Sequence, residues 1–207
     1  MFIYYPSCTF RKALPDTAKV VIDYLKSDME IAGCCRAKNP AFTENDTAVV
    51  ICGSCRTTLE TSVKAISLWE YLLSKEDFAW PDHSGLEVNV QDCWRNRNQP
   101  GVMNAAREIL GKMNIKVIPV SESLSEADFC GTLHYEVKDE GLKKRILECG
   151  DKPLYELPPE LQAAAMRDRV KAYNREWIVC DCTTCLTGVK MGGSNGVHLL
   201  ELIFGTR

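Results

Sequence analysis

Short apolar runs alternate with amphipathic stretches along the whole chain. Runs rich in β-branched and aromatic residues predict strands, and apolar residues spaced three and four apart predict helices. The predicted strands lie at 2–5, 47–51, 86–90, 115–120 and 177–180. The predicted helices lie at 16–26, 54–73, 101–113 and 159–174. This alternation of strands and helices favours an α/β fold with mainly parallel sheets.

The order of predicted elements restarts after a charged stretch at 74–85, which contains Pro81 and predicts a linker. Two similar segments close the parts on either side, and they read Ser67-Leu-Trp-Glu-Tyr-Leu and His198-Leu-Leu-Glu-Leu-Ile. We therefore predict two pseudo-repeated, Rossmann-like halves at residues 1–78 and 79–207. A long polar stretch at about 134–158 predicts an insertion in the second half.

The composition narrows the class of protein. A hydrophobic content of 45% and a charged content of 26% are typical of soluble globular domains. A net charge of -3 gives no cationic surface for nucleic acid or anionic membranes. The longest apolar runs are too short to span a bilayer, and the N-terminus lacks the pattern of a secretory signal. We therefore expect a cytoplasmic protein with no nucleic-acid partner and no membrane insertion.

Eleven cysteines occur along the chain in an order that is found twice. The first set is Cys8, Cys34, Cys35, Cys52 and Cys55, and the second is Cys93, Cys130, Cys182 and Cys185. Several of them follow predicted strands directly, and functional groups of parallel sheets gather beyond the carboxyl ends of strands. An odd number of cysteines in a reducing compartment disfavours a disulfide framework. Thiolate ligands for a soft metal or an iron–sulfur cluster are the better interpretation.

Two simpler interpretations remain open at this point. Cys52-Gly-Ser-Cys55 is typical of a thioredoxin-like redox pair, but that leaves the other cysteines of the first set unexplained. Zinc needs four ligands, whereas the first set offers five, and the adjacent Cys34-Cys35 pair suits a site with several metal atoms. Cys180 is predicted to be a buried packing residue rather than a fifth ligand of the second set, and Cys149 an incidental exposed thiol.

The order Cys … Cys-Cys-Gly … Cys-x-x-Cys, present twice, resembles the cysteine-rich CCG domain family. This family includes the CCG-type, cluster-binding polypeptide of heterodisulfide reductase and related domains of succinate, glycolate, lactate and glycerol-3-phosphate oxidoreductase systems. The resemblance covers nearly the whole chain, from Tyr4-Tyr5-Pro-Ser-Cys8 to His198-Leu-Leu-Glu-Leu. It implies a non-cubane [4Fe–4S] cluster at the first set. In the second set Phe129 replaces the first cysteine of the pair, which leaves four thiolates for a cubane cluster, a zinc ion or nothing.

The same resemblance implies an activity and partners. A disulfide or related thiol substrate would be reduced at the first cluster, with electrons from a ferredoxin-like donor or an iron–sulfur or flavin partner subunit. Arg36 stands where the family has glycine, and there it can anchor an anionic small disulfide substrate or balance the charge of a cluster. Two alternatives remain open. The chain can be a non-catalytic electron-transfer or docking subunit of a larger oxidoreductase, or a structural zinc–thiolate protein.

Overall fold

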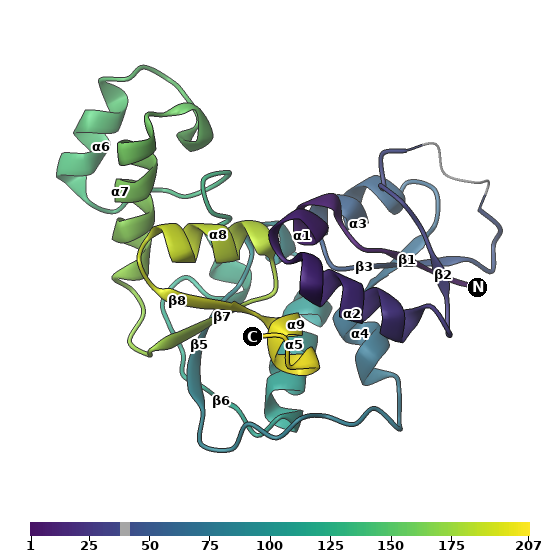
Figure 1. The fold of residues 1–207 in the computed structure, drawn as a ribbon. Helices are drawn as coiled ribbons and strands as arrows, with labels where there is room; N and C mark the ends of the chain where they lie inside the picture. The colour runs from purple at the N-terminus through teal and green to yellow at the C-terminus, as the bar shows by residue number, and fades with distance from the viewer. Residues whose placement is uncertain (38–41) are drawn as a thin grey trace.

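Two parallel sheets of four strands each form the framework of the protein (Figure 1). The computed structural model describes residues 1–37 and 42–207. The first sheet has the order β2-β1-β3-β4, with β1 at Phe2–Tyr5, β2 at Glu30–Ile31, β3 at Thr47–Val50 and β4 at Lys64–Ser67. The second has the order β6-β5-β7-β8, with β5 at Glu87–Gln91, β6 at Lys116–Val117, β7 at Trp177–Cys180 and β8 at Asn195–His198. The predicted α/β fold with parallel sheets is confirmed.

The helices repeat in the same order in both halves. The first half contains α1 (Cys8–Ala13), α2 (Pro15–Leu25), α3 (Gly53–Leu59) and α4 (Leu68–Leu73). Their counterparts in the second half are the 3-10 turn η1 (Trp94–Asn96) and helices α5 (Pro100–Lys112), α8 (Thr183–Met191) and α9 (Leu199–Phe204). The second half adds α6 (Glu140–Leu147), α7 (Pro159–Val170) and two further 3-10 turns, η2 (Leu124–Glu126) and η3 (Leu154–Glu156).

The two closing segments identified in the sequence adopt the same local structure. Each is a strand that runs directly into a short helix through a capping box, in which two backbone N–H groups are satisfied reciprocally. In the first half, Ser67 Oγ accepts from the Glu70 N–H at 3.1 Å, and Glu70 Oε2 accepts from the Ser67 N–H at 2.7 Å. In the second, Glu201 Oε2 accepts from the His198 N–H at 2.7 Å. The internal correspondence predicted from the sequence is therefore present in three dimensions.

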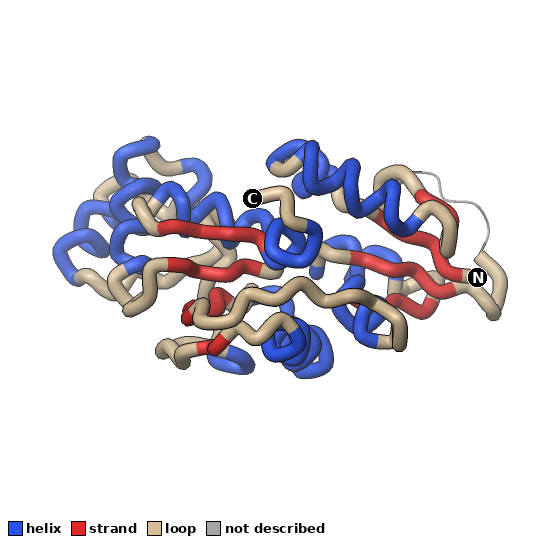
Figure 2. The backbone as a smooth tube through the Cα atoms, turned by 60° about the horizontal axis from the view of Figure 1, so that its bottom comes forward, coloured by secondary structure: helices blue, strands red, loops and turns tan. Residues whose placement is uncertain are grey.

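The carboxyl ends of the two sheets point toward one another in the middle of the molecule (Figure 2). Contacts between the halves come in matched pairs: α4 packs on α5 as α2 packs on α9, and α3 meets η1 as α1 meets α8. One hydrophobic core, which includes Trp69, Leu72, Ile109 and Leu200, runs through both halves. We use the word seam for the region between the two halves in which the carboxyl ends of the strands meet.

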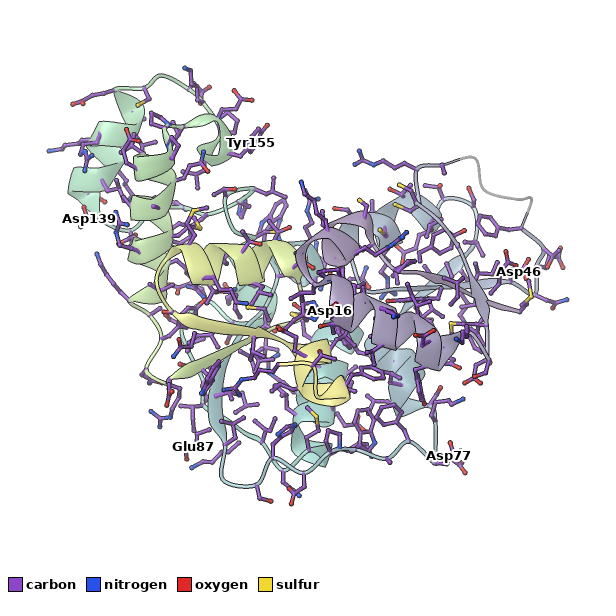
Figure 3. The ribbon with its side chains drawn as sticks, viewed as in Figure 1. Asp16, Asp46, Asp77, Glu87, Asp139 and Tyr155 are labelled. Carbon is purple, nitrogen blue, oxygen red and sulfur yellow. The ribbon has the colours of Figure 1, made fainter. Side chains whose placement is uncertain are left out.

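The insertion of the second half projects from this body. Figure 3 shows Asp139 and Tyr155 on the outlying part formed by α6, α7 and the loops between them. Asp168 on α7 fixes its base, because its Oδ2 accepts from the Tyr135 hydroxyl at 2.9 Å and from the Lys138 N–H at 2.7 Å. The insertion is therefore tied to the segment that follows Cys130.

Several details differ from the sequence prediction. The helix predicted at 54–73 is wrong in its middle, where β4 separates α3 from α4. The closing segment at 197–204 includes the end of β8 before α9 begins, and α1 and α6 were not predicted. The proposed boundary at residues 78 and 79 falls between α4 and β5 and stays a prediction. None of the described helices is long and apolar enough to cross a bilayer.

Candidate metal–thiolate centres

Four cysteines of the second set meet in one compact, mostly buried group. Their Sγ atoms all lie within 4.8 Å of one another, and those of Cys93 and Cys130 are 3.5 Å apart. Cys93 follows β5, and Cys182 and Cys185 lie at the start of α8 after β7. Cys130 lies in the segment between η2 and α6. We call Cys93, Cys130, Cys182 and Cys185 the closed group. A metal or cluster can be bound here.

The spacing of the closed group fits one tetrahedral metal ion. Four thiolates about 2.3 Å from a zinc ion stand about 3.8 Å from one another, the edge of that tetrahedron. The observed limit of 4.8 Å agrees with such an arrangement after a small contraction. In a cubane cluster each thiolate binds a different iron, so the four cysteine Sγ atoms must stand farther apart than they do around one ion. A single ion therefore fits the closed group as it stands, whereas a cubane cluster would require the four thiols to move apart.

Charge within the closed group is already biased toward thiolate. The neighbouring thiols of Cys182, Cys185 and Cys93 hold the pKa of Cys130 far below its usual value, and Arg95 adds to this effect. Hydrogen bonding with Cys130 and then with Cys182 raises the pKa of Cys93. One thiolate therefore accepts hydrogen bonds from the neighbouring thiols. A metal ion that binds this arrangement displaces the remaining thiol protons.

Two buried aspartates, each directly before a cysteine of the closed group in the sequence, form hydrogen bonds next to this group. Asp92, directly before Cys93, receives two hydrogen bonds of 2.7 Å from the guanidinium of Arg107. Asp181, directly before Cys182, accepts from Asn96 Nδ2 at 3.0 Å, and burial raises its pKa to about 8. Sequence reasoning missed these supports, although the repeated Asp-Cys pair was a signal that could have found them.

Phe129 stands beside the closed group, at the place where the first set has the first cysteine of its pair. It is fully buried, and its carbonyl oxygen accepts from the Trp94 N–H at 2.9 Å. The Cys185 thiol also donates to this carbonyl, at 3.5 Å. Phe129 therefore contributes its backbone to the site, while its ring packs in the buried core of the second half.

The first set is brought together only in part. The pKa of Cys55 is raised above all by the thiol of Cys52 and also by that of Cys35, so these three interact. Cys55 is buried, Cys35 and Cys52 are half-buried, and Cys34 is exposed next to them. Among the described residues, this set forms no group as compact as the closed group. We call Cys34, Cys35, Cys52 and Cys55 the open group.

Cys8 does not lie at the position of the first sheet that corresponds to Cys93 in the second sheet. Tyr5 pairs with Val50 as Gln91 pairs with Cys180, so the position that matches Cys93 is Ser7. Ser7 is buried with a φ of 55°, and Cys8 begins α1 with its side chain exposed. The role of Cys8 as a ligand of the first set stays a prediction.

Arg36 lies in the turn directly after the open group. Its side chain is exposed, and its backbone N–H donates to the Cys34 Sγ at 3.5 Å. The described residues provide no carboxylate within ion-pair distance of it. The guanidinium therefore faces solvent beside the open group, and the anchoring role expected of it stays a prediction.

The two groups face each other across the seam. The pKa of Cys52 is lowered overall by its hydrogen bonds, and negative charge on Cys182 acts against this lowering, which shows that the two cysteines interact. A Cβ atom built on Gly53, next to Cys52, would lie 3.1 Å from Arg95 Cβ and 2.8 Å from Asn96 Oδ1. The start of α3 therefore packs directly against the turn that follows Cys93, and both groups lie near the carboxyl ends of their sheets.

The remaining candidates have structural surroundings. Cys180 is fully buried in the core of the second half and is not part of the closed group, and Cys149 is half-buried at the end of α6. His198 is buried, with its pKa lowered to about 4 by desolvation, and His83 Nε2 lies 3.1 Å from the Leu202 carbonyl oxygen. His134 stacks on Trp94 at 4.0 Å.

Comparison with known proteins adds no family to this description. No protein-family model matches the chain, and no curated protein matches it. The resemblance to the CCG domain family therefore rests on the cysteine order, on the two parallel α/β sheets and on the closed group.

We expect Cys52 to be an unusually reactive thiol in metal-free protein. Hydrogen bonds from the Cys55 thiol and from the backbone N–H groups of Cys55 and Ser54 lower its pKa to about 6. The thiolate is the reactive form and predominates above the pKa, so alkylation should rise through about pH 6 rather than about pH 8.5. Iodoacetamide labelling across pH, followed by peptide mass mapping, measures this.

The matched control is Cys55→Ala, which removes the main donor to Cys52. It should move the Cys52 profile to higher pH. Identical profiles in the two proteins, with a midpoint near the ordinary value for cysteine, would contradict the assignment.

Proposed function

We propose that this protein is an iron–sulfur redox protein that reduces a small disulfide at the open group, while the closed group holds a single metal ion. The observation that carries the proposal is the unequal pair of thiol groups across the seam. The closed group has three buried thiols of four and little room for a substrate. The open group has an exposed thiol and two half-buried ones, so a substrate can reach it.

Cys35, Cys52 and Cys55 would hold the cluster, with Cys34 beside them and Cys8 as the ligand that the family resemblance adds. The cluster supplies one-electron chemistry that amino-acid side chains lack. Reduction of a disulfide breaks one S–S bond and consumes two electrons and two protons to give two thiols. The electrons would come, one at a time, from a ferredoxin-like donor or a partner subunit. Arg36 would hold an anionic part of the substrate near the exposed thiol.

Metal and sulfide content of anaerobically purified protein tests the proposal. We expect about four irons and four sulfides per chain at the open group, under the thiolate ligation of such clusters. Cys35→Ser should abolish or alter their EPR signal, whereas Cys185→Ser should leave it and remove one further metal ion. With reduced methyl viologen as donor, wild type should reduce 2-hydroxyethyl disulfide and Cys35→Ser should not.

A second candidate function is a structural zinc–thiolate protein without redox activity. The spacing of the closed group favours it, because four thiolates at this distance form a common structural zinc site. Zinc without sulfide in strictly anaerobic protein, together with no reduction of the disulfide, would select this function over the first. Iron and sulfide without disulfide reduction would instead select an electron-transfer subunit.

A further inference from the structure

We infer that two glycines, Gly131 and Gly188, close the second thiol group, and that Arg36 and Thr58 at the matching positions keep the first group open. These residues are specificity-determining positions that decide which of two similar sites a reagent or substrate can enter. The inference concerns access to the thiols and stands whether or not the open group reduces a disulfide.

Gly131 lies directly against the first turn of α8. Its φ is 56°, in the left-handed region that favours glycine. A Cβ atom at this position would lie 2.4 Å from the Thr184 carbonyl oxygen, which belongs to the backbone and cannot move aside cheaply. Glycine therefore allows the turn that contains Cys130 to seat on the helix that carries Cys182 and Cys185.

Gly188 makes the same contact from the helix side. A Cβ atom there would lie 2.7 Å from the Gly131 Cα and 2.6 Å from the Phe129 Cζ. Loop and helix therefore touch backbone to backbone, and the Phe129 ring packs against the position that has no side chain. Any side chain at either position would lift the loop and separate Cys130 from its partners.

The first half carries side chains at both positions. Cys52 and Cys55 match Cys182 and Cys185 through the strand register, so Thr58 matches Gly188 and Ser54 matches Thr184. Arg36 follows the cysteine pair where Gly131 follows Cys130. Both Arg36 and Thr58 are exposed, whereas Gly188 is buried. The loop with Cys34 and Cys35 therefore does not seat on α3 in the same way, which explains why Cys34 is exposed.

The test is the double variant Arg36→Gly, Thr58→Gly, with Arg36→Ala, Thr58→Ala as its matched control. Both variants remove the arginine charge and the threonine hydroxyl, but only the first removes both Cβ atoms. N-ethylmaleimide labelling of the purified, reduced and metal-free protein is followed for each cysteine by peptide mass mapping, with Cys149 as the internal reference outside both groups. The glycine variant should slow labelling of Cys34 and Cys35 at least about tenfold, as in a site open less than a tenth of the time. The alanine variant should label as wild type does.

The reverse change is Gly188→Ala. It should expose the closed group, so that Cys93 and Cys130 label at least about tenfold faster than in wild type while Cys149 is unchanged. Circular dichroism reports whether this variant folds, and the glycine variant decides the matter independently if it does not. Equal labelling of Cys34 and Cys35 in the glycine and alanine variants would overturn the inference.

Discussion

Removing the metal ion that we propose in the closed group should lower the melting temperature by roughly 8–16 °C. A ligand present at a thousand times its Kd stabilises the folded state by about 4 kcal/mol. Each kcal/mol moves the melting temperature of a domain of this size by about 2–4 °C. The loss should be concentrated in the second half, because Cys93, Cys130 and Cys185 belong to its buried core. Thermal melts monitored by circular dichroism, with and without a chelator under reducing conditions, measure the shift.

Matched variants assign this shift to one site. Cys185→Ser should melt low without chelator and show no further drop when chelator is added. Cys149→Ser, which changes a thiol outside both groups, should behave as wild type does. Cys35→Ser should retain most of the chelator-dependent shift. The assignment fails if wild type melts at the same temperature with and without chelator, or if Cys35→Ser removes the whole shift.

The second large effect is expected from substitution of Arg169, whose side chain connects α7 to the second sheet next to Phe129. The side chain is only 2% exposed, and its Nε donates to Gln91 Oε1 at 2.9 Å while a terminal nitrogen pairs with Glu122 at 3.0 Å. The guanidinium also lies 5.8 Å from the centre of the Phe129 ring. Removing one partner of a buried ionic network costs about 3–5 kcal/mol. Here Gln91, which would lose its donor, is fully buried, although Glu122 is partly exposed.

Arg169→Ala should therefore lower the melting temperature by roughly 6–20 °C, with the same conversion between free energy and temperature. Arg167→Ala is the matched control, since Arg167 lies on the same helix and is exposed. It should change the melting temperature little. Equal melting of the two variants would show that the buried network adds nothing to stability.

The sequence predicts most of the framework because its signals are local. Apolar runs predicted β1, β3, β5 and β7, and the repeated closing segments predicted the correspondence between the halves. β4 was hidden because its four residues lie between two helices and give no periodicity of their own. Helix α1 buries only Phe10, so no apolar face announced it.

The closed group was predicted by residue type but not in its geometry. The order of cysteines grouped Cys93, Cys130, Cys182 and Cys185, and the structure brings these four together. Their compactness depends on a contact between Gly131 and Gly188, which are far apart in the sequence. The displacement of Cys8 by one position is equally invisible, because it depends on the path of the chain through Ser7.

The matched contacts between the halves have a consequence for how such a chain can change over generations. Here a surface of one half contacts the corresponding surface of the other half through matched pairs of helices. Such a surface is the kind that joins two copies of a chain in a symmetric dimer. In a dimer of identical halves, every substitution appears twice, and a phenylalanine in place of a cysteine would alter both sites together. Joining the halves in one chain removes that restriction. One copy could gain Phe129 while the other kept the full set of thiols and acquired Arg36.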